Sequence, residues 1–253
     1  MKIIITVIAL FFYTAGSAQL QTLNADVYHW ANGTSKREIR TKIFEGSGAV
    51  LDIHAMNAIG LEKGKNLRLK ADSADNEHFY IVKKGPVKVV LNNRSYTLDR
   101  GSVVFVLPGD PVMISNAGET QAQLYEMIFR SKNGVNLQRG YASGPSFVMN
   151  WNNMTEKQTE KGSTRQLFDR KTAMLNRFDI HVTKLNVGLS SHPPHTHANE
   201  EIILMLEGDS EETIGTSTKQ SAAGDAIYLS TMIPHNLTNI GKIPCLYFAI
   251  QWN

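Results

Sequence analysis

Short apolar stretches separated by glycine, asparagine and proline run through most of the chain. The clearest are rich in β-branched and aromatic residues and cover residues 180–185, 201–206, 226–229 and 245–250. Such stretches, bounded by turn-forming residues, are typical of β-strands. No stretch shows the sustained 3.6-residue period of an amphipathic helix, although residues 156–168 are polar enough to contain a short one. The pattern predicts an all-β protein.

The second half of the chain repeats the first. Asp52-Ile53-His54 recurs as Asp179-Ile180-His181. Three glycines and one asparagine recur at a constant offset of 123 residues, which pairs Gly85 with Gly208, Gly101 with Gly224, Asn116 with Asn239 and Gly118 with Gly241. A repeat of this kind indicates two copies of one structural unit. We predict domains over residues 25–130 and 147–253, joined by a linker over residues 131–146, and the many short strands favour a closed barrel or jelly roll for each.

The N-terminal segment has the features of a signal peptide. Lys2 supplies a positive charge, an apolar run covers residues 3–13, and Gly16-Ser17-Ala18 provides the small residues of a cleavage site. The run is too short to span a bilayer. We therefore expect residues 1–18 to be removed after Ala18 and the mature protein to be periplasmic or secreted.

Composition narrows the range of partners. Hydrophobic residues make up 42% of the chain, enough for a substantial core. Lys and Arg total 26 against 23 Asp and Glu, and no concentrated basic run provides the positive charge that phosphate binding needs. We therefore expect a small-molecule ligand, no nucleic acid and no membrane association, while a homodimer remains open. Cys245 is the only cysteine, so an internal disulfide is excluded.

Three histidines and one glutamate in the second copy have the spacing of a metal site. His195 and His197 are two residues apart, so on an extended segment both side chains point to the same side. Glu201 follows at the start of a strand, and His235 comes from a different strand. Three imidazoles and one carboxylate suit a single divalent transition metal with open coordination positions. Mn²⁺ or Fe²⁺ fits best, and Zn²⁺, Ni²⁺ or Cu²⁺ remains open.

These residues resemble the two conserved signatures of the cupin superfamily. The first signature is matched by Gly188, His195, His197, Glu201 and Gly208, with one additional residue before the first histidine. The second is matched by Gly224, His235 and Asn239, although Ser230 and Met232 replace its proline and glycine. Together with the duplication, the resemblance implies a bicupin, a protein of two tandem cupin barrels with the double-stranded β-helix or jelly-roll fold.

The first copy lacks the ligand set. Subtracting 123 from the four ligand positions gives Asp72, Ala74, His78 and Val112. Alanine and valine cannot bind a metal ion, so we expect an N-terminal barrel that has lost its metal ligands. The chain should therefore hold one metal ion, in the C-terminal barrel.

Three further residues are candidates for contact with a substrate. Met205 alternates with Glu201 along a strand and is expected in the cavity wall. Tyr228 aligns with Phe105 of the first copy, which favours a core position, but its hydroxyl group is able to face the metal. His181 repeats His54, so we expect a fold-related hydrogen bond at both, with His181 also a candidate for the cavity.

Glu200 and its counterpart in the first copy are expected to lie outside the metal site. Glu200 precedes the ligand Glu201, so it should point the opposite way on a strand and lie at the surface. Its counterpart in the first copy is Glu77, for which we expect a structural role.

The resemblance implies small-molecule chemistry at the metal. Cupin enzymes include dioxygenases, lyases and decarboxylases, aminohydrolases and isomerases, most of which act on small oxygen-rich molecules. Other cupins bind a small ligand or a sugar through the metal without turnover, so a non-catalytic module is the alternative. Spacing alone does not identify a general acid or base.

Overall fold

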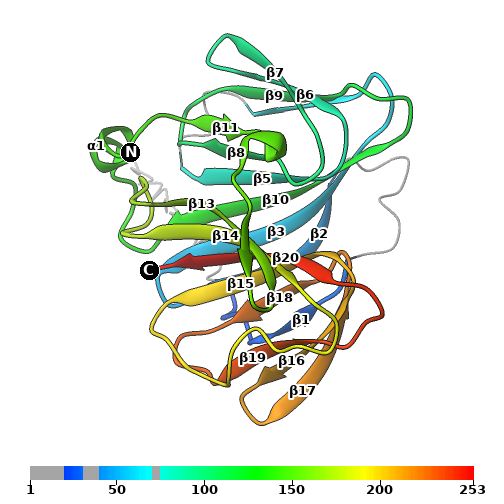
Figure 1. The fold of residues 1–253 in the computed structure, drawn as a ribbon. Helices are drawn as coiled ribbons and strands as arrows, with labels where there is room; N and C mark the ends of the chain where they lie inside the picture. The colour runs from blue at the N-terminus through cyan, green and yellow to red at the C-terminus, as the bar shows by residue number, and fades with distance from the viewer. Residues whose placement is uncertain (1–19, 31–39, 70–74) are drawn as a thin grey trace, which may run out of the picture.

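The computed structural model describes residues 20–30, 40–69 and 75–253, and it consists mainly of β-strands (Figure 1). The strands of the first half are β2 (Arg40–Gly46), β3 (Leu51–Leu61), β4 (Asn66–Leu69), β5 (Glu77–Lys84), β6 (Val87–Leu91), β7 (Arg94–Leu98), β8 (Val103–Val106), β9 (Val112–Asn116) and β10 (Ala122–Ser131). Those of the second half are β12 (Lys157–Thr159), β13 (Gly162–Arg170), β14 (Phe178–Leu185), β15 (Glu200–Glu207), β16 (Asp209–Ile214), β17 (Ser217–Ala222), β18 (Ala226–Leu229), β19 (His235–Asn239) and β20 (Cys245–Trp252).

Each half pairs a large antiparallel sheet with a small one. In the first half, the sheet β11-β8-β5-β10-β3-β2, in which β11 is Phe147–Met149, is combined with β4-β9-β6-β7. In the second half, the sheet β1-β18-β15-β20-β14-β13-β12, in which β1 is Asp26–Tyr28, is combined with β17-β16-β19. The prediction of an all-β fold with two tandem double-sheet barrels is confirmed.

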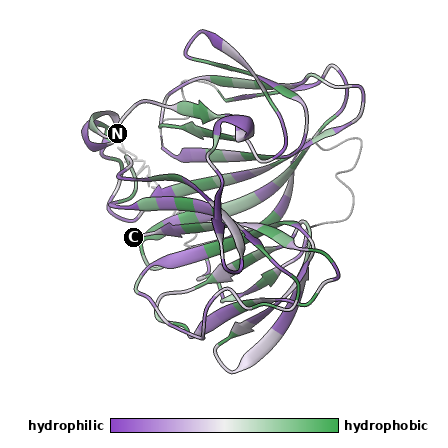
Figure 2. Ribbon diagram, viewed as in Figure 1, coloured by the Kyte–Doolittle hydropathy of each residue, from purple (hydrophilic) through white to green (hydrophobic). Residues whose placement is uncertain are grey.

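The two large sheets pack against each other, so their strands are apolar on both faces. On β15, Ile202 and Leu204 belong to a core shared by the two halves, whereas Ile203 and Met205 face the interior of the second barrel. Figure 2 shows hydrophobic residues along the strands in the centre of the molecule and hydrophilic residues on the loops. Because strand side chains alternate between faces, the uninterrupted apolar run at residues 202–206 serves both cores.

Two short strands cross between the halves. β1 (Asp26–Tyr28) pairs with β18 of the second barrel, and β11 (Phe147–Met149) pairs with β8 of the first. The segment that precedes each barrel therefore extends the large sheet of the other barrel. Residues 25–130, which the sequence suggests as one domain, contribute a strand to the opposite half.

The predicted linker and the polar segment after it both have regular structure. Residues 131–146 include α1 (Leu137–Ala142), which Asn136 caps by accepting a hydrogen bond from the Arg139 backbone amide at 2.9 Å. Residues 156–168, which are polar enough to contain a short helix, instead form the β12–β13 hairpin. Among the described residues, no helix is long and apolar enough to cross a membrane.

The repeated Asp-Ile-His sequence is not a structural equivalence. Phe129 pairs with His54, and Trp252, 123 residues later, pairs with Phe178. His54 therefore corresponds to Phe178, and His181 lies three residues further along its strand. This strand register corrects the alignment of His54 with His181 that the sequence suggests.

His54 also lacks the hydrogen bond expected of it. Its ring is fully buried and neither nitrogen has a hydrogen-bond partner. The ring packs edge-on against Trp252, with 4.8 Å between centroids, and against Phe44 at 5.2 Å. Desolvation lowers the pKa of His54 to about 3, so the neutral imidazole acts as a core aromatic group between the two barrels.

Candidate metal centre

The predicted ligands come from a loop and two strand ends. His195 and His197 lie in the loop between β14 and β15, Glu201 is the second residue of β15, and His235 is the first residue of β19. The loop is bound to β19 by two backbone hydrogen bonds between His195 and His235, at 3.2 and 3.0 Å, and by a further bridge between Ser190 and Thr238. This pairing places the loop histidines over the end of β19.

The structure brings the four side chains together. One ring nitrogen from each of the three histidines lies within 4.8 Å of the other two. The Oε2 atom of Glu201 is 3.0 Å from Nε2 of His197 and 3.5 Å from Nε2 of His235. These groups could hold one divalent metal ion.

Backbone carbonyl groups orient two of the imidazoles. Nδ1 of His197 lies 2.8 Å from the Asn199 carbonyl oxygen, and Nδ1 of His235 lies 2.9 Å from that of Ile233. Donation from Nδ1 to these oxygens leaves both Nε2 atoms free for a metal ion. Nε2 of His235 is buried without a close partner, which is the orphaned donor atom that a metal ion would satisfy.

The carboxylate keeps its charge despite burial. Burial alone would raise the pKa of Glu201, but the hydrogen bond from His197 and the nearby His235 outweigh it and hold the pKa at about 2. The same contact raises the pKa of His197, whereas desolvation and the neighbouring histidines lower that of His195. The site therefore combines an ionised carboxylate with at least one imidazole that favours its neutral, ligating form.

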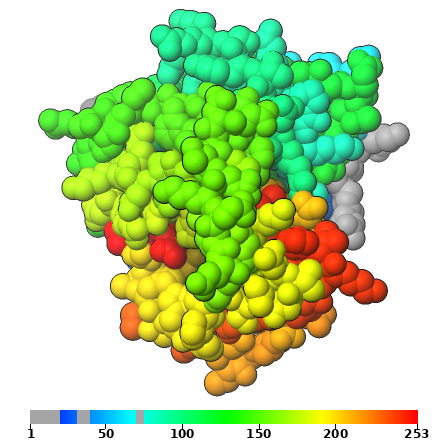
Figure 3. Space-filling model, viewed as in Figure 1, coloured from blue at the N-terminus to red at the C-terminus, as the bar shows by residue number. Residues whose placement is uncertain are grey.

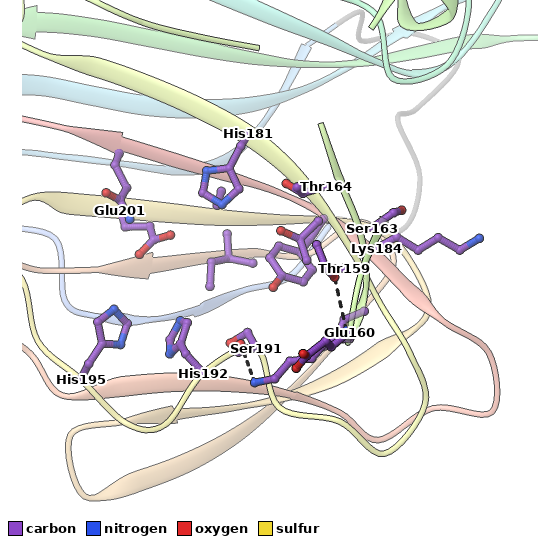
Figure 4. Close-up of a pocket in the computed structure, with 17 residues that line it drawn as sticks. Thr159, Glu160, Ser163, Thr164, His181, Lys184, Ser191, His192, His195 and Glu201 are labelled. Atoms are coloured by element: carbon purple, nitrogen blue, oxygen red, sulfur yellow. Dashed lines mark hydrogen bonds between the residues drawn. The ribbon is translucent and has the colours of Figure 1, made fainter. Parts of the chain in front are cut away.

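A cavity of about 560 Å³ opens over this cluster (Figure 4). Figure 4 shows His181, His192, His195 and Glu201 around one space. Six side chains that carry a hydroxyl group also line the cavity, those of Thr159, Ser163, Thr164, Thr183, Ser191 and Tyr247.

The β12–β13 hairpin forms one wall of the cavity. Lys161, at its turn, donates hydrogen bonds to the carbonyl oxygens of Ser190 and Ser191 at 2.9 and 3.0 Å. In the space-filling view the light-green segment that includes this hairpin lies over the yellow C-terminal half (Figure 3). The hairpin thus closes one side of the metal pocket.

The three predicted substrate-contact residues have different positions. His181 lines the cavity. Met205 is fully buried in the core of the second barrel and is not one of the lining residues. Tyr228 needs a correction, because it lies in the core between the barrels and its hydroxyl group donates to Glu200. On β18 it points away from the barrel interior, so it does not face the metal.

The surface position predicted for Glu200 is also wrong. Glu200 is 1% exposed and accepts hydrogen bonds across the interface between the barrels. Its donors are the Tyr228 hydroxyl group, the Ala49 amide at 2.9 Å, the Val50 amide at 3.3 Å and the Trp252 indole at 3.2 Å. Glu77 makes the reciprocal contact, accepting from the Thr172 hydroxyl and the Ala173 amide, both at 2.6 Å, which agrees with its expected structural role.

Because His192 precedes two prolines, its sequence context favours an exposed loop position, and no motif marks Lys161. The His192 ring lies 3.9 Å from that of His195, between centroids, and lines the cavity. Its position three residues before His195 was the available signal. Lys161 lies in a polar hairpin that no motif marks.

The first barrel differs at the corresponding positions. Leu69 pairs with Val112 as His195 pairs with His235, so two apolar side chains replace two imidazoles. Asp72 and Ala74, which the sequence offset suggests, lie outside the described residues.

Comparison with known proteins agrees with this fold. Residues 181–251 match the family model of the cupin domain. The oxalate decarboxylase of Lactobacillus farciminis, solved as a formate complex, superposes with a TM-score of 0.68 at 14% identity, covering 91% of this chain and 87% of that chain. The fold is that of two cupin barrels.

Two other solved structures give similar matches. A study of the Mn(II) centres in Bacillus subtilis oxalate decarboxylase provides a structure with a TM-score of 0.63, 14% identity and coverage of 90% of this chain and 77% of that chain. Protein Ylba from E. coli has a TM-score of 0.64, 14% identity and coverage of 79% and 77%. No curated protein sequence matches the chain.

Proposed function

We propose that this protein is an exported, metal-dependent enzyme with one mononuclear centre, formed by His195, His197, Glu201 and His235. The observation that carries the proposal is a cluster of three imidazoles and one carboxylate at the edge of a cavity. Four protein ligands leave coordination positions open for a substrate or water. Mn²⁺ or Fe²⁺ fits best, and the Mn(II) centres named for the Bacillus subtilis oxalate decarboxylase structure support Mn²⁺.

The cavity supports a small, oxygen-rich organic substrate. A bound divalent ion would act as a Lewis acid toward a substrate oxygen. His181 faces this space together with hydroxyl side chains, of which Ser163 and Thr164 already donate hydrogen bonds to Glu156 and to the Val182 carbonyl oxygen. A volume of about 560 Å³ is in the range of pockets that enclose drug-sized ligands, so it favours a substrate larger than a two-carbon diacid.

The reaction is proposed as one of four types: dioxygenation, lyase or decarboxylase chemistry, aminohydrolysis or isomerisation. A non-catalytic small-ligand or sugar-binding module is the second candidate. The combination of hydroxyl and apolar side chains in the wall supports it, because such a surface suits a sugar whether or not the sugar reacts. Turnover separates the two candidates.

The test begins with the mature chain, residues 19–253. Elemental analysis after reconstitution with Mn²⁺ should find about one metal ion per chain. A substrate screen that records oxygen uptake, carbon dioxide, ammonia and ligand binding then separates enzyme from binding module. Failure to retain any divalent ion, or two tightly bound ions per chain, would contradict the single centre.

Export is a separate part of the proposal. The proposed signal peptide, residues 1–18, lies outside the described residues. Mass spectrometry of protein from the native host should find Gln19 at the amino terminus. An intact Met1 would contradict cleavage after Ala18.

A further inference from the structure

One carboxyl group inside the second barrel has no partner. Glu212 lies on β16, its side chain is fully buried, and neither carboxyl oxygen has a hydrogen-bond partner. Burial of a carboxyl group without hydrogen bonds destabilises a fold. Such a group in a folded protein needs an explanation.

The first barrel shows that the fold itself does not require this carboxyl group. Val89 pairs with Ile114, and 123 residues later Glu212 pairs with Leu237. Val89 is fully buried in the apolar core of the first barrel. A valine therefore fills the position that Glu212 occupies next to the metal centre.

Glu212 lies close to the metal ligands. It is on the strand next to β19, and its neighbour on the same face, Ile214, pairs directly with His235. A carboxyl group that is fully buried without a partner favours its neutral form, and the neutral carboxyl group is a hydrogen-bond donor.

The metal ligands differ in whether an outer hydrogen bond holds them. His197 and His235 each have a backbone carbonyl group that fixes the ring. The Glu201 carboxylate, in contrast, has hydrogen bonds and ion pairs only with those same two imidazoles among the described residues. Carboxylates that bind a metal ion are usually held by an outer hydrogen bond. The ligand without an outer donor and the buried donor without a partner thus lie in the same barrel.

We propose that Glu212 is a positioning residue of the metal centre, whose carboxyl group donates a hydrogen bond to Glu201 through one bridging water molecule. This bond fixes the Glu201 carboxylate for metal binding. The inference rests on the proposed metal centre. The main expected effect of Glu212 is on the affinity of that centre for its metal ion.

The decisive variant is Glu212→Val, which copies the first barrel. Its Mn²⁺ dissociation constant, measured by isothermal titration calorimetry, should rise about ten- to hundredfold, as for other outer-shell changes. Its metal-free melting temperature should stay the same or increase, because an unpaired carboxyl group is removed. Glu212→Gln retains a donor of the same size and should bind Mn²⁺ more tightly than Glu212→Val. If Glu212→Val does not fold, Glu212→Met gives the same comparison with a longer side chain.

Ile214→Val is the matched control, since it trims an inward side chain on the same strand opposite His235. It should bind Mn²⁺ like the wild type. Wild-type affinity in Glu212→Val, or equal loss in Glu212→Gln, would overturn the proposal while leaving the metal centre in place. A wild-type chain that binds no metal ion would instead overturn the proposed function, so the two failures are distinguishable.

Discussion

Replacing Glu200 with alanine should strongly destabilise the contact between the two barrels. The carboxylate is 1% exposed and accepts four hydrogen bonds, from two backbone amides of the first barrel and from Tyr228 and Trp252 of the second. Glu200→Ala leaves all four donors buried without an acceptor. No other side chain in this part of the interface replaces it, because Glu77 serves the reciprocal contact.

The magnitude follows from the number of donors. An unsatisfied buried donor costs at least about 1 kcal/mol, so four of them lower the free energy of unfolding by about 4 kcal/mol. For a chain of this size, that corresponds to a fall in melting temperature of about 8 to 16 °C. Glu200→Gln keeps the volume and one acceptor oxygen, so its loss should be about half as large.

Differential scanning calorimetry and urea unfolding of the metal-free protein measure this loss. Glu207→Ala is the matched control on the same strand, because its carboxylate is 45% exposed and pairs with Arg100 at the surface. A surface ion pair of this kind contributes about 1 kcal/mol or less. If Glu200→Ala lowered stability no more than Glu207→Ala, the reasoning about the buried carboxylate would be wrong.

Three further predictions concern single groups. His235→Val copies Val112 of the first barrel and should fold normally but lose its metal ion to a mild chelator; elemental analysis after dialysis checks this, and full retention would refute the site. Gly48→Ala should destabilise the fold as Glu200→Gln does, because a Cβ atom there would lie 2.2 Å from the Glu200 carboxylate; an unchanged melting temperature would contradict it. The pKa of Glu126 is held at about 2, below the 4.5 of the unfolded chain, by Arg40 and His78 against the effect of burial. Its contribution, about 3 kcal/mol, is present above pH 4.5 and lost as the pH falls toward 2. The free energy of unfolding in urea should therefore fall more between pH 6 and pH 3 for the wild type than for Glu126→Gln.

The strands and the ligand cluster were predictable because their signals are local. Residues 226–229 form β18 within the bounds suggested by composition, and the other three apolar stretches lie inside longer strands. His195 and His197 are predictable because two-residue spacing on extended backbone places side chains on one side. These inferences need only the residues within a single segment, whereas His235 comes from another strand and is assigned through the resemblance to the second cupin signature.

The face assignments failed where both faces of a strand are buried. Glu200 was placed at the surface because it alternates with Glu201, yet the opposite face of β15 is the interface between the barrels. Tyr228 belongs to the same interface. Alternation gives the side of a sheet on which a residue lies, but tertiary packing decides what covers that side. The pairing of β1 and of β11 with the opposite barrel depends on the same packing, so no local sequence pattern predicts it.

The chance repeat at His54 shows a further limit of sequence comparison. Three identical residues suggested a register that strand pairing contradicts by three positions. The glycines and asparagine with a constant offset were the better guide, because turns fix backbone geometry and tolerate few alternatives. Residues on strand faces changed more freely between the two copies.

The interiors of the two barrels differ at the place where the second barrel has its metal cavity. In the first barrel, Tyr80 and Glu126 are paired on neighbouring strands, and Arg40 binds the buried carboxylate at 2.5 and 2.8 Å. The corresponding pair in the second barrel is Ile203 and Ala249, and both line the metal cavity. A phenol and a salt-bridged carboxylate thus occupy the volume that isoleucine and alanine leave open. The first barrel fills its interior with a polar network of its own side chains, whereas the second barrel leaves that space for a ligand.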